Sequence, residues 1–421
     1  MSCDWNRRDC LRWTAGSAVP WLANIGRLLA AEGERSATRA PARSIILLWL
    51  AGGPSQLETF DPHPGSRIAG GTGAISTAVK GIKLAEGYPR LAAAMRSVSL
   101  IRSMTSTEPD HERGTQLAKT GYTPDAVTVF PSIGAICCHE LPAQGADIPR
   151  HVSILAGSWP SQGGFLGSEY DAFQTGDPAH PVPDVHTGVS NARYRRRLED
   201  LAVVERAFAA RHGLHAETLG HARLADQARR MMSSEQLRAF DVSEEPASLR
   251  RAYGETPFGR GCLAARRLTE VGVRAIEVTL SGWDSHVDNH AAHRKLATTL
   301  DPAMAALIQD LRERERLDTT LVICAGEFGR TPKINALGGR DHWTAAFSVA
   351  LAGGAMRGGV VIGQTDPDGG RHVPDPKTFA DLHATILKAL GINPAKENVS
   401  PARRPVKLSE GNVISELLQV A

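Results

Sequence analysis

Short hydrophobic runs alternate along the chain with segments of helical periodicity. From Ser44 onward, each run is bounded by glycine, proline or polar clusters, which is typical of strands that are buried on both faces of a sheet. The runs are SIILLWL, SVSLI, HVSIL, RAIEVTL, TLVICA and FSVALA. Apolar residues at helical spacing appear between them, notably in HRKLATTLDPAMAALIQDLRERERL and TFADLHATILKALG. This alternation predicts an α/β fold, in which helices flank one mostly parallel central sheet.

One stretch departs from the alternation. Residues from about 191 to 241 are rich in Arg, Ala, Leu and Glu and contain hardly any β-branched runs. This composition predicts a helical insertion. The basic run RYRRRLED inside it is more typical of a solvated helix face than of a binding patch. A chain of 421 residues is long enough for one large domain with such an insertion, and we expect that domain at residues 44–421.

The N-terminal segment has a different pattern. Arg7 and Arg8 precede a modest apolar stretch, which is typical of a twin-arginine export signal. The apolar stretch is too short and too interrupted to span a membrane. We therefore expect a signal peptide at residues 1–31, cleaved near Ala30 or Ala31, and a polar linker at residues 32–43. An uncleaved amphipathic leader helix is the alternative.

Export sets the expected location and one expected partner. A twin-arginine signal implies the twin-arginine (Tat) export machinery as a partner and the periplasm or cell surface as the destination. No integral membrane span is expected. The net charge of +3 is too small and too scattered to indicate a nucleic-acid partner. Four of the six cysteines lie beyond the leader without a paired spacing, which indicates buried packing: Cys137, Cys138, Cys262 and Cys324.

Candidate chemistry lies next to the predicted strands. The relevant segments are AGGPSQLETFD, SGWDSHVDN and GEFGRTP, each directly after a strand, and GGRDHW, just before FSVALA. Ligands of open α/β sheets bind in the crevice beyond the carboxyl ends of the strands. We therefore expect these segments to meet at one edge of the sheet.

Taken together, GGPSQLETFDP, GWDSH, GEFGRTP and GRDHW resemble the motifs of the DUF1501 family, an uncharacterised group within the alkaline-phosphatase-like superfamily. The resemblance covers nearly the whole mature chain. It implies the three-layer alkaline-phosphatase-like fold. It implies no established reaction, because a fold does not by itself fix a function.

The resemblance also implies a metal site. Enzymes of the superfamily hold one or two divalent ions with Asp and His residues from loops that follow successive strands. The matching positions are Asp284 and His286, Glu327 where the superfamily usually has Asp-His, and His342 with its neighbour Asp341. Mixed oxygen and nitrogen ligands suit zinc, manganese or iron better than calcium.

Three further residues are candidates for catalysis or anion binding. HERGTQLAKTG has the layout of the sulfatase signature, but His111 stands where the modified cysteine would lie, so a conventional sulfatase is not expected. An imidazole there can bind a metal, act as an acid or base, or be the nucleophile. Arg330 and Arg340 can neutralise a phosphate or sulfate, or can pair internally with Glu327 or Asp341.

Three functions agree with these features. The favoured one is a metal-dependent hydrolase of phosphate or sulfate esters, acting on a small anionic or sugar-ester substrate. The first alternative is a non-catalytic exported binding protein that retains the fold; the absence of an Asp after the first strand, and of a Ser or Cys nucleophile, supports it. The second alternative is a metal-dependent mutase or transferase.

The export prediction can be tested by changing Arg7 and Arg8 together to Lys. The paired arginines are the feature that the export route recognises, so we expect the precursor to stay inside the cell. Cell fractionation and the mass of the recovered chain measure this. Unchanged delivery of the mature chain would contradict a twin-arginine signal.

Overall fold

The computed structural model describes residues 40–143, 145–185, 188–212, 226–369 and 375–419. The predicted signal peptide and most of the predicted linker lie outside these residues. The described helices and strands begin at Ser44 and belong to one compact unit, Pro41–Gln419.

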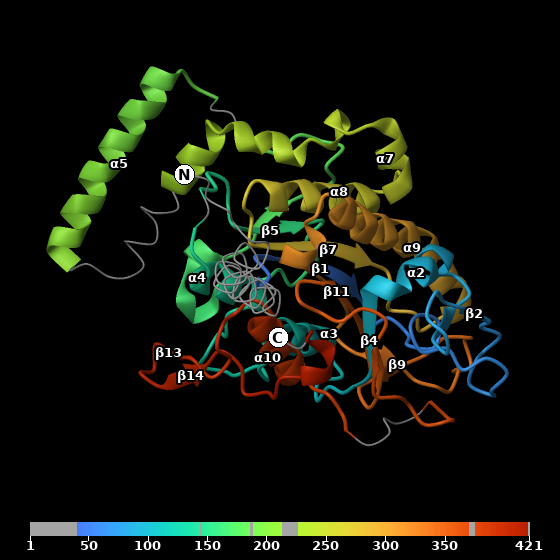
Figure 1. The fold of residues 1–421 in the computed structure, drawn as a ribbon. Coiled ribbons are helices and arrows are strands. Elements are labelled where there is room, and N and C mark those ends of the chain that lie inside the picture. Colours follow the sequence, from blue (N-terminus) through green and yellow to red (C-terminus); the bar gives the residue numbers. More distant parts are fainter. Residues whose placement is uncertain (1–39, 144, 186–187, 213–225, 370–374, 420–421) are drawn as a thin grey trace, which may run out of the picture. The chain divides into compact units, whose positions relative to one another are not determined.

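A mixed central sheet organises the described residues (Figure 1). Its strand order is β12-β4-β11-β8-β1-β7-β5-β6. All neighbouring strands are parallel except for β11, which runs antiparallel to both β4 and β8. The strands are β1 (Ser44–Ala51), β4 (Val98–Met104), β5 (His151–Ile154), β6 (Phe173–Thr175), β7 (Ala275–Ser281), β8 (Thr320–Ala325), β11 (Phe347–Gly353) and β12 (Val361–Ile362). This confirms the predicted mostly parallel sheet.

The side chains of β1 show why the sheet lies in the middle of the fold. Successive residues of a strand point to opposite faces. Ile46, Leu48 and Leu50 belong to one hydrophobic cluster, whereas Ile45, Leu47 and Trp49 belong to another. Hydrophobic residues on both faces can be buried only if helices cover both sides, which is the three-layer arrangement that the family resemblance implied.

Different helices cover the two faces (Figure 1). The cluster with Leu48 includes residues of α2 (Pro89–Ala94), α8 (Pro257–Glu270) and α9 (Asn289–Glu313). The cluster with Leu47 includes residues of α3 (His111–Thr120), α4 (Ile133–Glu140) and α10 (Phe379–Ala389). The predicted helical segments TFADLHATILKALG and HRKLATTLDPAMAALIQDLRERERL therefore lie on opposite faces.

The remaining elements are peripheral to the sheet. Residues 213–225 of the stretch predicted to be a helical insertion lie outside the described residues. The described part of that stretch contains α5 (Asn191–His212) and a short 3-10 helix at Glu235–Phe240. A second 3-10 helix at Val242–Glu244 and α7 (Ala247–Tyr253) follow it. Three small antiparallel pairs complete the fold: β2 (Ala74–Ser76) with β3 (Lys83–Ala85), β9 (Gly329–Arg330) with β10 (His342–Trp343), and β13 (Glu397–Val399) with β14 (Pro405–Lys407).

Local signals fix the helix that carries His111. Helix α3 begins after Asp110, whose side chain accepts a hydrogen bond from the Arg113 N–H at 3.1 Å, as an N-cap does. The helix ends at Gly121, which has a left-handed φ of 76°. A side chain at Gly121 would meet the ring of His383 at 2.9 Å. Glycine is therefore required there for both backbone conformation and packing.

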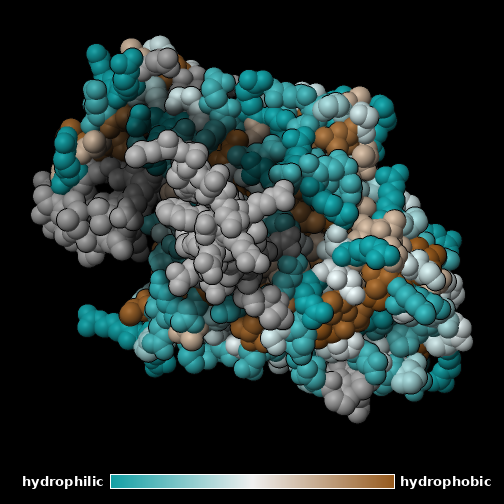
Figure 2. All heavy atoms as spheres, in the orientation of Figure 1, coloured by the Kyte–Doolittle hydropathy of each residue, from teal (hydrophilic) through white to brown (hydrophobic). Residues whose placement is uncertain are grey.

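Surface and cysteine features agree with a globular domain. On the face drawn in Figure 2, hydrophobic residues form scattered patches among hydrophilic ones, as is usual for protein surfaces. Within the described ranges, no helix is both long enough and apolar enough to cross a membrane. The four cysteines beyond the leader are buried and free, as their spacing predicted.

Two of the three buried histidines in the described residues, His293 and His383, have strongly lowered pKa values and are neutral rings. His293 donates from Nδ1 to the Asn289 carbonyl at 3.0 Å and accepts the Ser55 N–H at Nε2 at 2.8 Å. His383 donates from Nε2 to the Ala118 carbonyl at 2.9 Å. Burial lowers the pKa of each ring to about 4. An unfolded histidine titrates near 6.5, so between about pH 6.5 and pH 4 the unfolded chain binds protons that the folded chain excludes.

We therefore expect the free energy of unfolding to fall as the pH is lowered from about 6.5 to about 4, by about 1.4 kcal/mol per pH unit for each of these histidines. Urea unfolding at a series of pH values measures the slope. His383→Gln should reduce the slope by the share of one histidine, whereas His180→Gln, at an exposed position, should leave it unchanged. An unchanged slope in His383→Gln would contradict the neutral buried ring.

Candidate metal centre

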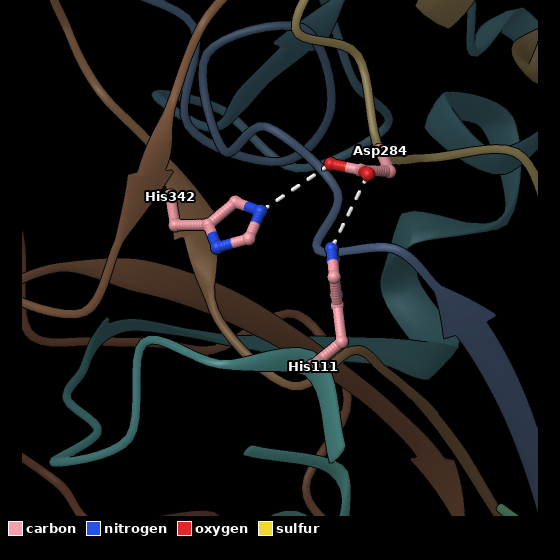
Figure 3. A group of neighbouring side chains, drawn as sticks. All are labelled: His111, Asp284 and His342. Atoms are coloured by element: carbon pink, nitrogen blue, oxygen red, sulfur yellow. Dashed lines mark hydrogen bonds and ion pairs between the residues drawn. The ribbon is translucent and has the colours of Figure 1, made fainter. Parts of the chain in front are cut away.

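The candidate residues meet at the carboxyl edge of the sheet. Strands β1, β7 and β8 are adjacent and parallel, so their carboxyl ends share this edge. Asp284 and His286 follow β7, and Glu327 follows β8. His111 is the first residue of helix α3. His342 lies in β10, and its partner strand β9 directly follows the loop of Glu327. Figure 3 shows His111 and His342 pointing from different segments toward the carboxylate of Asp284.

His111 lies between two carboxylates. Its Nδ1 is 2.7 Å from Oε1 of Glu327, and its Nε2 is 3.3 Å from Oδ2 of Asp284. Glu327 is only 1% exposed, and the same oxygen accepts the Gly52 N–H at 2.9 Å. The hydrogen bond to Glu327 raises the pKa of His111. The ring is thus held by Glu327 behind it and presents Nε2 to Asp284.

His342 and His286 face the other carboxylate oxygen of Asp284. The Nδ1 of His342 lies 2.6 Å from the Pro109 carbonyl, and the Nδ1 of His286 lies 2.9 Å from Oδ1 of Asp341. Their Nε2 atoms are 3.1 Å apart, and lie 3.3 Å and 3.1 Å, respectively, from Oδ1 of Asp284. Both rings therefore repeat the arrangement of His111, with an oxygen at Nδ1 and Asp284 at Nε2.

The oxygen partners decide which nitrogen carries the proton in each neutral ring. A carbonyl or an ionised carboxylate can only accept, so Nδ1 of each ring must be the donor and Nε2 keeps its lone pair. Burial lowers the pKa of His342, which favours its neutral form. Lone pairs of neighbouring Nε2 atoms then face one another and a carboxylate. Such a group is stable only if a proton or a cation lies among its members.

Arg330 keeps Asp284 ionised. The buried guanidinium donates from Nη2 to Oδ1 of Asp284 at 2.6 Å, from Nε to the Gly53 carbonyl at 2.9 Å, and to the Gly52 carbonyl. Partial burial alone would raise the pKa of Asp284, but Arg330, followed by His111 and His286, lowers it to about 2. Because Arg330 contacts Oδ1, the oxygen Oδ2 near His111 remains the more available ligand atom.

Arg340 has a structural position. It is fully buried and donates from Nη2 to Oε1 of Glu58 at 2.8 Å and to the Ile68 carbonyl at 2.8 Å. Its Nη1 donates to the carbonyls of Thr331 and Pro332. Every guanidinium nitrogen is thus used inside the protein, so the structure does not support the predicted anion binding by Arg340.

Internal pairing, which was the alternative for the two arginines, describes both of them better. The sequence suggested Glu327 or Asp341 as partners, whereas the structure pairs Arg330 with Asp284 and Arg340 with Glu58. Which carboxylate each arginine pairs with depends on how the loops pass one another at the sheet edge. The spacing of residues in the sequence does not indicate this arrangement of the loops.

The donor set fits a divalent cation. Ligand atoms of His111, Asp284 and His342 all lie within 4.8 Å of one another (Figure 3), and His286 adds a fourth nitrogen beside two of them. Nε2 of His111 and Oε2 of Glu327 are buried without a hydrogen-bond partner among the described residues. Orphaned buried polar atoms need an explanation such as a bound ion. The side chain of Asp284 is 46% exposed, so an ion can reach the group from solvent.

The five predicted ligands therefore cluster with His111, but they do not all face the same point. Asp284, His286 and His342 point toward one another, and Glu327 lies behind His111. Asp341 lies behind His286 in the same way. Carboxylates behind metal-binding histidines fix the ring orientation and raise ligand basicity. The Pro109 carbonyl behind His342 has the same position, and no feature of the sequence suggested it.

A cavity opens beside the candidate centre. Its volume is about 230 Å³, and its walls include His111, Asp284, Glu327 and Gly52. A larger cavity of about 770 Å³ lies between the loop at 178–185 and residues of the 3-10 helix Glu235–Phe240, α7 and α8, and none of the predicted site residues lines it. The smaller cavity is therefore the candidate substrate site.

The fold and the centre define an α/β protein with a three-layer arrangement and a histidine–carboxylate cluster at the strand ends. The chain belongs to the family described as protein of unknown function (DUF1501), whose family model matches residues 42–418. This confirms the family suggested by the four motifs. No curated protein matches the chain.

Several solved structures are similar to the chain at low identity. The alkaline phosphatase from the Antarctic bacterium TAB5 is 14% identical, with 85% of this chain and 100% of that chain covered and a TM-score of 0.37. The PsFucS1 sulfatase from Pseudoalteromonas sp. is 16% identical, with 86% and 70% covered and a TM-score of 0.39. The phosphonate monoester hydrolase SpPMH from Silicibacter pomeroyi is 12% identical, with 90% and 76% covered and a TM-score of 0.35. At these values, the likeness carries no argument about activity.

The metal centre predicts the behaviour of two histidine variants. We expect His342→Ala and His111→Ala each to weaken zinc or manganese binding by at least about tenfold, because each removes one ligand. They should also remove the part of the stability that a chelator removes from the unmodified protein, because metal binding is coupled to folding. Elemental analysis and thermal unfolding with and without chelator measure the two effects.

The control for these variants is His180→Ala, which changes an exposed histidine outside the cluster. It should keep both metal content and chelator sensitivity. A purified protein that is metal-free and indifferent to added zinc and manganese would contradict the centre and would favour a network held by Arg330.

Proposed function

We propose that this chain is a metal-dependent hydrolase of phosphate or sulfate esters, with the cation held by His111, His286, His342 and Asp284. One observation carries the proposal. Each of the three imidazoles has Nδ1 on a fixed oxygen and directs Nε2 toward the same carboxylate. Three nitrogens and a carboxylate in this arrangement are a ligand set for zinc, manganese or iron.

The residues around the ligands orient the histidine rings and keep Asp284 ionised. Glu327, Asp341 and the Pro109 carbonyl keep the three rings in one tautomer and orientation. Arg330 keeps Asp284 ionised. When bound, a divalent cation would supply Lewis acidity toward an anionic ester and would make water a better nucleophile. The cavity of about 230 Å³ beside His111 is where the ester would lie.

The cysteines do not supply a nucleophile. All four in the described part of the chain are buried, and burial raises the pKa of each thiol, that of Cys138 to about 12. A thiol without solvent access and with a raised pKa is not reactive. Attack by water therefore suits this chain better than a covalent route through cysteine.

His111 is then a ligand in this proposal. Its Nδ1 is engaged by Glu327, so Nε2 is its one free nitrogen, and that atom faces Asp284. A nitrogen bound to a metal has no lone pair left for proton transfer or for attack on the ester. Of the three roles that the sequence left open for His111, the geometry therefore favours metal binding.

The family resemblance supports the same proposal. The four motifs resemble those of a family within the alkaline-phosphatase-like superfamily, and the family model matches residues 42–418 of the chain. We propose that the chain acts outside the cytoplasm after twin-arginine export. The paired Arg7 and Arg8 support this location.

A non-catalytic binding protein is the second candidate, and one contact favours it. Arg330 already neutralises Asp284 at 2.6 Å. Gly52 directly follows β1, at a position where an acidic side chain would add a metal ligand, and glycine has no side chain to supply one. If Arg330 and a proton on His111 compensate the carboxylates, the cluster needs no metal.

Hydrolysis assays separate the two candidates. We expect the protein loaded with zinc or manganese to hydrolyse at least one of 4-nitrophenyl phosphate, bis(4-nitrophenyl) phosphate, 4-nitrophenyl sulfate and 4-nitrophenyl phenylphosphonate. Chelation should abolish the activity, and Asp284→Asn should lower kcat/KM by about 100-fold or more, because it weakens the ligand set. His180→Ala should retain full activity. A protein that hydrolyses none of the four esters, with or without added metal, would be the binding protein.

A further inference from the structure

The cavity at the candidate centre adjoins a second one. The inner cavity of about 230 Å³ and an outer cavity of about 270 Å³ share Thr115, Lys119, Ser158 and Trp159 as lining residues. His111, Thr115 and Lys119 follow one another at four-residue intervals in α3. Residues at this spacing lie on one face of a helix. One face of α3 therefore runs from the candidate centre to the outer cavity.

The wall that the two cavities share is anchored to the sheet. Nζ of Lys119 donates to Oε1 of Glu277 in β7 at 2.9 Å and to the Trp159 carbonyl at 2.8 Å. The Ser161 hydroxyl donates to Oε2 of the same glutamate at 2.7 Å. Lys119 and Glu277 are both buried. The loop that carries Trp159 is therefore held in place before any ligand arrives, which lowers the entropy lost on binding.

Aromatic rings form much of the outer cavity. Tyr122 and Phe130 line it and stack on each other with centroids 4.4 Å apart and planes at 8°. Trp159 is 37% exposed at the boundary with the inner cavity. Backbone hydrogen bonds join the two loops concerned, from Ser132 N to the Gln162 carbonyl at 2.9 Å and from Phe165 N to the Val129 carbonyl at 2.9 Å. The rings thus belong to one hydrogen-bonded unit.

The polar lining indicates an uncharged ligand rich in hydroxyl groups. The amides of Gln116 and Gln162 can donate to and accept from hydroxyls, and the Glu112 carboxylate can accept from them. Lys119 is the one cation among the described residues that line this cavity, and Glu277 pairs with it. A second phosphate or sulfate would therefore have no free positive partner here. A purely hydrocarbon group would offer no hydrogen bond to Gln162 or to Glu112 and Gln116, which otherwise pair with each other at 3.3 Å.

We infer that the outer cavity binds an uncharged sugar ring, whose sulfate or phosphate ester reaches the candidate centre. The C–H face of a sugar ring packs on aromatic rings, and its hydroxyls suit the amides and carboxylates around them. A cavity of about 270 Å³ is near the lower end for ligand pockets, which suits one ring. The ester part rests on the proposed function, whereas binding of the ring does not.

The experiment measures binding of neutral sugars separately from hydrolysis. The probes are methyl glycosides of glucose, galactose, mannose, fucose, xylose and N-acetylglucosamine, each also prepared as sulfate and phosphate esters. Saturation-transfer NMR on the full mature chain detects binding of the neutral glycosides. We expect at least one to bind, and Trp159→Ala to weaken it by at least about tenfold through loss of a packing ring.

Two matched variants complete the design. Val127→Ala changes an 81% exposed residue in the same loop region that does not line the cavity, and it should bind like the unmodified protein. His342→Ala removes a candidate metal ligand and should also bind neutral glycosides normally. Persistence of glycoside binding in Trp159→Ala would overturn the assignment of the sugar to this cavity.

The two proposals fail in different ways. If no glycoside, neutral or esterified, binds while 4-nitrophenyl esters are hydrolysed, the sugar inference is wrong and the hydrolase stands. If neutral glycosides bind through Trp159 but no esterified glycoside or 4-nitrophenyl ester is hydrolysed, the hydrolase is wrong and the sugar cavity stands. A sugar ester whose KM rises in Trp159→Ala with little change in kcat would support both.

Discussion

Three imidazoles turn toward the carboxylate of Asp284, and each is held from behind by an oxygen that can only accept a hydrogen bond. This constraint determines the chemistry of the whole centre, because it fixes the proton of each neutral ring on Nδ1 and leaves Nε2 as an acceptor. Acceptors that converge in this way repel one another until a proton or a cation joins them. The arrangement costs free energy in the ion-free protein, and a bound cation or a shared proton would remove that cost.

The sheet produces this convergence through its topology. Three adjacent parallel strands end at the same edge, so loops that are more than 40 residues apart in sequence meet there. Two fully buried arginines then hold the loops against one another, with Arg330 on the carbonyls of Gly52 and Gly53 and Arg340 on Glu58 and the Ile68 carbonyl. A buried guanidinium that lost these partners would be strongly destabilising. The arginines therefore stabilise the frame of the centre, and Arg330 also contacts Asp284 within it.

The parts predicted from the sequence are those with a local signal. Runs such as SIILLWL and TLVICA are buried on both faces, so their apolar character alone indicated β1 and β8. The strand-end rule then indicated which residues would gather, including Asp284 and His342. The rule could not indicate which of these side chains contact one another, such as Glu327 with His111. That order depends on side-chain directions in loops that have no periodicity.

The buried ion pair of Lys119 and Glu277 also needs a physical explanation. Replacing a buried ion pair with apolar side chains is often neutral or stabilising, so stability alone does not explain why a lysine and a glutamate occupy the core beside β1. Their hydrogen bonds offer a reason, because they position the Trp159 carbonyl and the Ser161 hydroxyl in one loop. That loop forms the wall common to both cavities. The buried ion pair thus orients the loop that forms this wall, in the same way that the buried Arg330 orients Asp284 at the centre.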